Sequence, residues 1–143
     1  MFLLDTDHIS VLQWIEEPAF THLSDRLDAI KGSDPGVTVI SYHEQTIGWH
    51  ALINRAKTDQ QLARGYDRLR NVLKWYAQFD VLPFSMPAIA EFHRLRAEGV
   101  RIATLDLRIA AIAIAQGAIL LTRNTADFSR VPGLRFEDWT KTA

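Results

Sequence analysis

The feature that most constrains this chain is a set of four short apolar segments separated by long stretches with helical periodicity. The apolar segments are Phe2 to Leu4, Val37 to Ile40, Val81 to Leu82 and Ala118 to Leu121. Short apolar runs of this kind are typical of buried strands, and parallel neighbours need long crossover connections between them. A sheet connected in this way is covered on both faces. The pattern therefore predicts an α/β fold, a three-layer sandwich with a mostly parallel central sheet flanked by helices.

The intervening stretches predict helices with defined ends. Gln45 to Leu73 carries apolar side chains at helical spacing, and we interpret it as a helical hairpin broken near Thr58–Asp59. Pro87 to Glu98 and Leu105 to Gln116 predict two further helices, each followed by a glycine. Gly32 to Gly36 (GSDPG) is expected to be the loop that leads into the second strand. No repeat or linker interrupts the chain, so residues 1–143 are predicted to form a single domain.

The composition limits both the compartment and the metal chemistry. The chain has 143 residues, of which 48% are hydrophobic and 23% charged, as is usual for one soluble domain. It contains no cysteine, so a metal would have to be bound by carboxylates, amides or histidines, which favours hard cations. The start MFLLDTDHIS is too short and too acidic for a signal peptide or a membrane span. We therefore expect a cytoplasmic protein without a membrane segment.

Acidic side chains follow the predicted strands. Asp5 comes directly after the first strand, Glu44 lies shortly after the second, and Asn124 and Asp127 follow the last, while Asp106 begins an apolar helix. Ligands of an open parallel sheet bind beyond the carboxyl ends of its strands. Each acid alone could be a helix cap. Several acids at one edge would repel one another, and a bound cation is the usual compensation. The sequence therefore predicts a magnesium or manganese site.

Four motifs in this order resemble the PIN domains of VapC-type toxins. They are LLDTDHIS, ISYHEQTIG, LDLRIAAIAIAQG and LLTRNTADFSRVPGLRFEDW, and together they span nearly the whole chain. The resemblance implies a PIN-like fold and a divalent-metal-dependent endoribonuclease. It also implies a homodimer that is neutralised by a small cognate antitoxin. An arginine from the antitoxin entering the acidic groove would neutralise the acids.

The resemblance also assigns roles to individual residues. Asp5, Glu44 and Asp106 match the three acids of the family's metal centre. The fourth position is open between Asn124, which matches the family's TxN pattern, and Asp127. We expect Thr6, Asp7, Thr122 and Asn124 to act around the ion, in contact with its ligands or through water. Asp7 departs from the asparagine or serine of many relatives, and on an extended strand it would share the side of Asp5.

Basic and aromatic residues offer candidate RNA contacts. The net charge is −1, so basic residues must be concentrated locally if the substrate is RNA. Arg108 and Arg123 flank the proposed acids and are predicted to receive phosphate oxygens, although pairing with nearby acids is the alternative. The four tryptophans could stack on bases, but large aromatics more often fill a core or a dimer face. The five histidines lack the spacing of a helical metal site.

Two other functions are compatible with parts of the sequence. Asp5-Thr6-Asp7 after an apolar strand resembles the Asp-x-Asp signature of aspartyl-phosphate phosphatases, in which Asp5 would be the nucleophile. That scheme also needs a suitably placed lysine and a later acidic pair, and the later sequence offers only Lys74, Lys141 and Glu137-Asp138. The other alternative is a catalytically weak PIN-like module that serves only to bind a partner.

Overall fold

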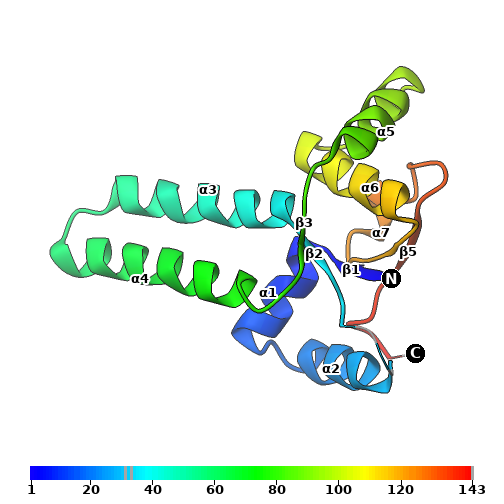
Figure 1. Ribbon diagram of the computed structural model, residues 1–143. Coiled ribbons are helices and arrows are strands. Elements are labelled where there is room, and N and C mark those ends of the chain that lie inside the picture. The colour runs from blue at the N-terminus through cyan, green and yellow to red at the C-terminus, as the bar shows by residue number, and fades with distance from the viewer. Residues whose placement is uncertain (31, 33, 143) are drawn as a thin grey trace.

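The computed structural model describes residues 1–30, 32 and 34–142 (Figure 1). Its strands are β1 (Phe2–Leu4), β2 (Val37–Thr38), β3 (Val81–Leu82), β4 (Ile119–Leu121) and β5 (Arg135–Glu137). Its helices are α1 (Thr6–Trp14), α2 (Ala19–Ala29), α3 (Val39–Arg55), α4 (Asp59–Tyr76), α5 (Met86–Ala97), α6 (Thr104–Gln116) and α7 (Thr125–Phe128). No helix within this described part of the chain is both long and apolar enough to cross a membrane.

The strands form one parallel arrangement in the order β3-β2-β1-β4-β5. β1 pairs with β4, β4 with β5, and β2 with β3, all in parallel. A parallel bridge between Leu3 and Gly36 joins the two groups. A Cβ at Gly36 would lie 2.9 Å from Cδ2 of Leu3, so the absence of a side chain lets the two strands approach closely. The strand order reverses between β1 and β4, which is where ligands bind in open sheets of this kind.

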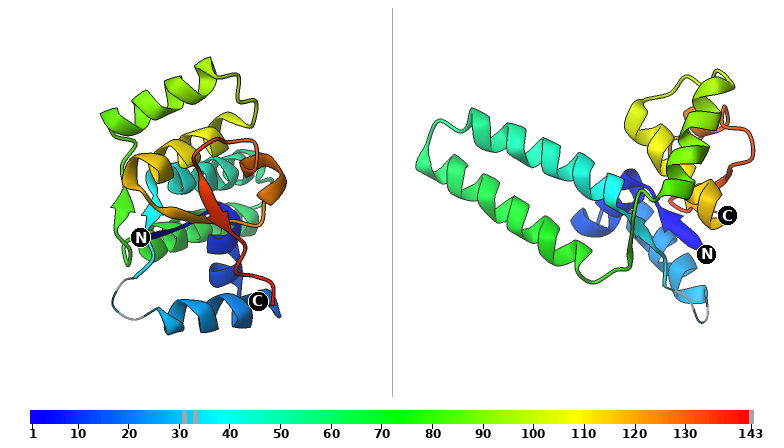
Figure 2. Two further views of the ribbon diagram at one scale, coloured as in Figure 1. Left: turned by 90° about the vertical axis from the view of Figure 1, so that its right-hand side faces the viewer. Right: turned by 45° about the horizontal axis from the view of Figure 1, so that its top comes forward.

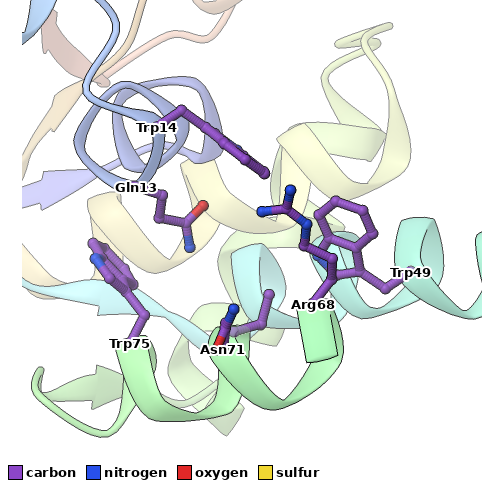
Figure 3. A pocket seen from close by; sticks show the side chains of 7 residues that line it. Gln13, Trp14, Trp49, Arg68, Asn71 and Trp75 are labelled. Carbon is purple, nitrogen blue, oxygen red and sulfur yellow. The ribbon is translucent and has the colours of Figure 1, made fainter. Parts of the chain in front are cut away.

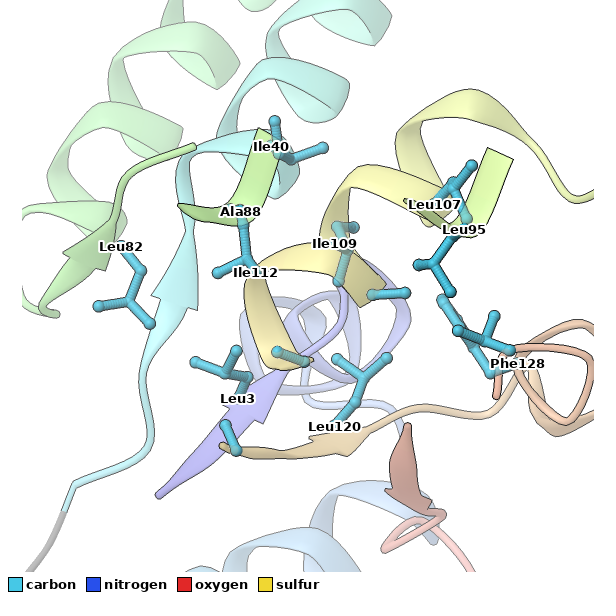
Figure 4. Packing of buried hydrophobic residues seen from close by; sticks show 14 of the residues in the cluster. Leu3, Ile40, Leu82, Ala88, Leu95, Leu107, Ile109, Ile112, Leu120 and Phe128 are labelled. Atoms are coloured by element: carbon cyan, nitrogen blue, oxygen red, sulfur yellow. The ribbon is translucent and has the colours of Figure 1, made fainter. Parts of the chain in front are cut away.

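Helices cover both faces of the sheet, because successive strand residues point to opposite sides. Leu3 and Leu120 pack with α5 and α6 in one buried cluster (Figure 4). Leu4 and Leu121 pack with α1, α2 and α4 in a second cluster. The predicted three-layer sandwich is therefore confirmed. Figures 1 and 2 show the α3–α4 hairpin extending away from the sheet.

The predicted helices are confirmed, with small shifts at their ends. The hairpin break falls where it was expected, because the Thr58 hydroxyl accepts the Gln61 N–H and begins α4. The two hairpin helices extend beyond the predicted range, from Val39 to Tyr76. The loop predicted at Gly32 to Gly36 includes Ser33, which lies outside the described residues.

The predicted strand Val37 to Ile40 is wrong in its second half. Only Val37 and Thr38 are extended, and Val39 and Ile40 begin α3. The Thr38 hydroxyl accepts the Ser41 N–H at 3.2 Å and caps this helix. The capping bond therefore overrides the strand preference of the β-branched residues Val39 and Ile40. Helix α2 and strand β5 were not predicted from the sequence, and α1 and α7 entered only as the helices that Asp5 and Asp127 could cap.

Candidate metal centre

Asp5 lies between β1 and α1, at the point where the strand order reverses. Only 5% of Asp5 is exposed. One carboxylate oxygen accepts the Thr6 N–H at 2.8 Å, which caps α1. The other oxygen accepts the hydroxyl of Thr122 at 2.7 Å, and Thr122 directly follows β4. The carboxyl ends of the two neighbouring strands are thus joined through this carboxylate.

The surroundings of Asp5 favour its neutral form. Burial is the largest cause and the charges of Asp7 and Asp106 add to it, so the pKa of Asp5 is raised to about 7. The bonds from Thr6 and Thr122 act in the opposite direction but do not compensate. A carboxylate in this position is stabilised by any cation that binds beside it.

Asp106 stands in the first turn of α6 without capping it. The N-cap residue is Ala103, which makes no side-chain capping bond, and no hydrogen bond within the described structure involves the Asp106 carboxylate. Burial first, and then the charges of Glu44, Asp127 and Asp7, raise the pKa of Asp106 to about 6. The helix-cap interpretation of Asp106 is therefore wrong, and acids from three other segments contribute to its raised pKa.

Glu44 reaches the same region from α3. It is half-buried and shares the wall of a surface cleft with Thr6 of α1. Its charge raises the pKa of Asp106, and together with burial and Asp5 it raises the pKa of Tyr76. The acids that the family resemblance singled out, Asp5, Glu44 and Asp106, thus act on one another electrostatically.

Asp7 does not lie on an extended strand beside Asp5, as the sequence suggested. Asp5 caps α1 and Asp7 belongs to the first turn of that helix, because the chain leaves the strand directly after Leu4. One Asp7 oxygen accepts the Arg123 backbone N–H at 2.9 Å and lies 3.3 Å from the Thr122 hydroxyl. Asp7 therefore joins α1 to the segment after β4, and its charge contributes to the raised pKa of Asp5.

The buried ring of His8 holds the other oxygen of Asp7. His8 is fully buried, and its Nε2 accepts the Trp139 backbone N–H at 3.2 Å. The proton of the neutral ring is then on Nδ1, which donates to Asp7 over 2.8 Å. Sequence reasoning treated His8 as ordinary and missed this contact. The pair Asp7-His8 next to a buried strand is the signal that could have indicated it.

Asn124 and Asp127 approach from the segment that contains α7. The Asn124 amide donates to Asp127 at 3.1 Å, so Asn124 orients Asp127. The charge of Asp127 contributes to the raised pKa of Asp106. Asp127 is therefore electrostatically coupled to the candidate site.

The two arginines that were predicted to bind phosphate have different surroundings. An Arg123 side-chain nitrogen lies 3.7 Å from a carboxylate oxygen of Glu16, with both side chains half exposed. The Arg108 guanidinium lies 5.9 Å from the Phe84 ring and 5.8 Å from the Phe92 ring. The Nε of Arg108 is buried without a hydrogen-bond partner among the described residues. Contact of either arginine with phosphate stays a prediction.

The chemistry of the donors fits a hard divalent cation. Carboxylate oxygens are the ligands that Mg²⁺ prefers. Burial first, and then the charges of neighbouring acids, raise the pKa values of Asp5 and Asp106, and a cation beside them would favour their charged forms. Within the described part of the chain, no three Asp, Glu or His side chains already stand together as a ligand set. An ion would therefore have to draw these carboxylates closer together.

A parallel α/β sandwich with acids gathered at the carboxyl ends of its strands defines the class of fold and site. The family described as PIN domain matches residues 2–134, and the chain belongs to this family. The membership of this chain in the family confirms the fold that the motif resemblance implied.

Relatives of known name are similar over part of the chain. The tRNA(fMet)-specific endonuclease VapC of Shigella flexneri is 38% identical over 68 residues, which cover 45% of this chain and 52% of that protein. Ribonuclease VapC2 of Rickettsia felis is 36% identical over 69 residues, which cover 46% of this chain and 52% of that protein. The chain thus spans about half the length of these curated relatives in the matched segments.

Solved structures are similar over nearly the whole chain. A DNA-bound VapBC from Salmonella typhimurium has a TM-score of 0.74 at 26% identity, and the match covers 96% of this chain and 97% of that one. VapBC-1 from nontypeable Haemophilus influenzae has a TM-score of 0.77 at 23% identity, with 98% of each chain covered, and this likeness concerns the fold alone.

Proposed function

We propose that this chain is a divalent-metal-dependent endoribonuclease that acts as the toxin of a VapBC-type toxin–antitoxin pair. The observation that carries the proposal is the buried carboxylate of Asp5, which joins the ends of β1 and β4 at the point where the strand order reverses. The raised pKa of Asp106, due first to burial and then to the charges of Glu44, Asp127 and Asp7, supports it. The names of the Shigella and Rickettsia relatives, an endonuclease and a ribonuclease, support the same reaction class.

In this proposal Asp5, Glu44, Asp106 and Asp127 hold Mg²⁺ or Mn²⁺, with Asn124 in place of Asp127 as the alternative fourth ligand. When bound, such an ion supplies an activated water and offsets the charge that develops on the phosphate. Thr6 and Thr122 keep the Asp5 carboxylate in one orientation through their hydrogen bonds. Asp7 fixes the backbone after β4 through the Arg123 N–H. Arg108 and Arg123 are the proposed phosphate contacts.

The geometry disfavours the phosphatase alternative. A nucleophilic Asp5 would need an accessible oxygen, yet the residue is 5% exposed and both its oxygens accept hydrogen bonds. Lys141 lies beside Asp138, 3.7 Å away, and so does not supply the charge that scheme requires next to Asp5. A binding module without catalysis would have no need to keep a buried Asp5 whose pKa is raised by burial and by neighbouring acids.

The proposal extends to a partner. The structural relative from Salmonella is a VapBC complex, and with the motif resemblance it supports a partner for this chain. We infer that the protein works in the cytoplasm, dimerises and is neutralised by a small antitoxin. A basic antitoxin residue placed among the acids would offset the same repulsion that a metal ion offsets. Co-purification with the product of an adjacent small reading frame tests this part directly.

Cleavage of RNA by three variants tests the proposed reaction. Asp5→Asn and Asp106→Asn are each expected to lower turnover by about a hundredfold or more in Mg²⁺ or Mn²⁺, because they remove proposed ligands. Asp28→Asn, an exposed acid on α2, is the matched control and should cleave as wild type does. Far-UV circular dichroism should be native for all three. An Asp5→Asn or Asp106→Asn protein that cuts at the wild-type rate would exclude the metal-centre mechanism.

A further inference from the structure

A cleft leads from the acidic site along α1, α3 and α4. Its part nearest the site includes Thr6 and Glu44 in its wall. The next part lies against α4 and shares Gln13, Trp14 and Trp49 with the first. The two parts are therefore adjacent, and a chain-like ligand that follows both would come close to the candidate metal centre.

Two tryptophans and an arginine meet in this cleft. The ring centres of Trp14 and Trp49 lie 6.5 Å apart. The Arg68 guanidinium lies over the Trp14 ring, 4.2 Å from its centre, and 6.0 Å from the centre of Trp49 (Figure 3). Trp14 remains 47% exposed with Arg68 in place. A large aromatic ring left this open in a cleft offers a flat surface to a further flat ligand.

The charge of the cleft is positive, unlike that of the whole chain. Next to it lies a further hollow, which shares Leu52 and Arg55 with the part nearest the site and is also lined by Arg64. The combined wall therefore has three arginines, Arg55, Arg64 and Arg68, and Glu44 is the acidic residue among its described lining residues. The whole chain has 16 basic and 17 acidic residues. Basic charge is thus concentrated here, as an RNA substrate requires.

Amide groups supply hydrogen-bonding edges beside the rings. The side chains of Gln13 and Gln45 exchange two hydrogen bonds, of 3.1 and 2.8 Å, across α1 and α3. Asn71 is exposed on the facing side of α4. Each of these amides has further donor and acceptor capacity, which base edges can use.

We propose that this cleft binds a single-stranded segment of the RNA substrate, with a base stacked on Trp14 and phosphates paired with Arg55, Arg64 and Arg68. The inference rests on the proposed ribonuclease function and places the strand next to the reacting site. A single strand is required because the faces of paired bases are covered by their neighbours.

Binding of RNA without cleavage tests the cleft. The parent protein is Asp106→Asn, and the probe is a fluorescent single-stranded RNA of about 12 nucleotides with random sequence, measured by anisotropy. Adding Trp14→Leu should weaken binding about tenfold or more, because leucine keeps an apolar surface but loses base stacking. Trp14→Phe should recover much of the affinity. Tyr66→Leu is the matched control, since Tyr66 is an aromatic on α4 that is 56% exposed and lines a different hollow.

The salt dependence of binding tests the ionic part. Arg68→Gln in the same parent should make the slope of log affinity against log salt shallower, by the amount expected for the loss of roughly one phosphate contact. Unchanged slope and unchanged affinity in Arg68→Gln would contradict the proposed pairing with phosphate.

Three results would overturn the proposal. They are a parent protein that binds no RNA, a Trp14→Leu variant that binds as the parent does, and equal losses in Trp14→Leu and Tyr66→Leu. If Trp14→Leu loses a co-purifying protein yet binds RNA normally, the cleft belongs to that protein partner. Cleavage of RNA by the wild-type protein, with Asp106 in place, separates the two proposals. If wild type cleaves RNA but Trp14→Leu does not weaken binding, the cleft proposal fails and the ribonuclease proposal stands. If Trp14→Leu weakens binding but wild type cleaves no RNA, the ribonuclease proposal fails and the RNA-binding cleft stands.

Discussion

At the scale of single residues, Asp5 serves local structure and the proposed chemistry at once. Its carboxylate caps α1 through Thr6, as the cap interpretation predicted. A cap does not require burial next to other acids, and most caps are exposed to water. The raised pKa of Asp5 therefore points to a second role, because the fold bears an unfavourable charge there in the absence of a cation.

This charge makes stability depend on pH in a defined direction. The pKa of Asp5 is about 7 in the folded protein and about 4 in an unfolded chain, so the folded state holds its proton longer. Stability of the metal-free protein should therefore fall as pH rises from about 4 to about 7. In chelator at about pH 8, Asp5→Asn should unfold at a higher urea concentration than wild type. Its free energy of unfolding should be larger by on the order of a few kcal/mol.

The difference between Asp5→Asn and wild type should vanish below about pH 4, where both side chains are neutral. Asparagine caps helices nearly as well as aspartate, so loss of the cap should not mask the effect. Asp28→Asn provides the control for an exposed acid and should show no such difference. A gap that stays constant across the pH series would mean that the Asp5 carboxylate is not destabilised by its surroundings.

At the scale of elements, the α3–α4 hairpin carries Glu44 and most of the RNA cleft, and its packing depends on a glycine. A Cβ on Gly65 of α4 would lie 2.7 Å from Cγ1 of Ile53 on α3, whereas a Cβ on Gly48 of α3 would meet nothing within 4 Å. Both glycines lie inside helices, where alanine is intrinsically favoured. The space around each glycine therefore decides whether an alanine there stabilises or destabilises the protein.

We expect Gly48→Ala to stabilise the protein by about 0.5–1 kcal/mol, which is the helix-propensity difference. Gly65→Ala should destabilise it by about 1–3 kcal/mol, because the added methyl group forces the two helices apart. Chemical denaturation of both variants is the measurement. If Gly65→Ala proved as stabilising as Gly48→Ala, the close contact of the two helices would be refuted.

The elements also show which parts of the fold sequence patterns can predict. The helices around Gln45–Leu73 and Leu105–Gln116 were predictable because their apolar periodicity extends over several turns. The boundary between β2 and α3 was not, because Val39 and Ile40 favour strands and only the Thr38 capping bond reveals the helix. β5 was missed because its three residues, Arg135–Glu137, lack an apolar run.

At the scale of the whole molecule, the candidate site depends on segments far apart in sequence. The rule that ligands gather beyond the carboxyl ends of parallel strands was enough to predict a site at Asp5 and Glu44. The contact of Asp5 with Thr122, the Asp7–His8–Trp139 chain and the stacking of Arg68 on Trp14 depend on tertiary geometry. Periodicity and spacing do not contain that information.

Direct measurement of Mn²⁺ binding tests the central claim that these carboxylates form one metal centre. Electron paramagnetic resonance detects free Mn²⁺, so the loss of its signal reports binding without RNA or turnover. Wild type should bind Mn²⁺, and Asp5→Asn, Glu44→Gln and Asp106→Asn should each weaken that binding about tenfold or more, because each removes an anionic oxygen ligand. Asp28→Asn should bind as wild type does. A wild-type protein that leaves the Mn²⁺ signal unchanged, or three variants that bind as tightly as wild type, would contradict the metal centre.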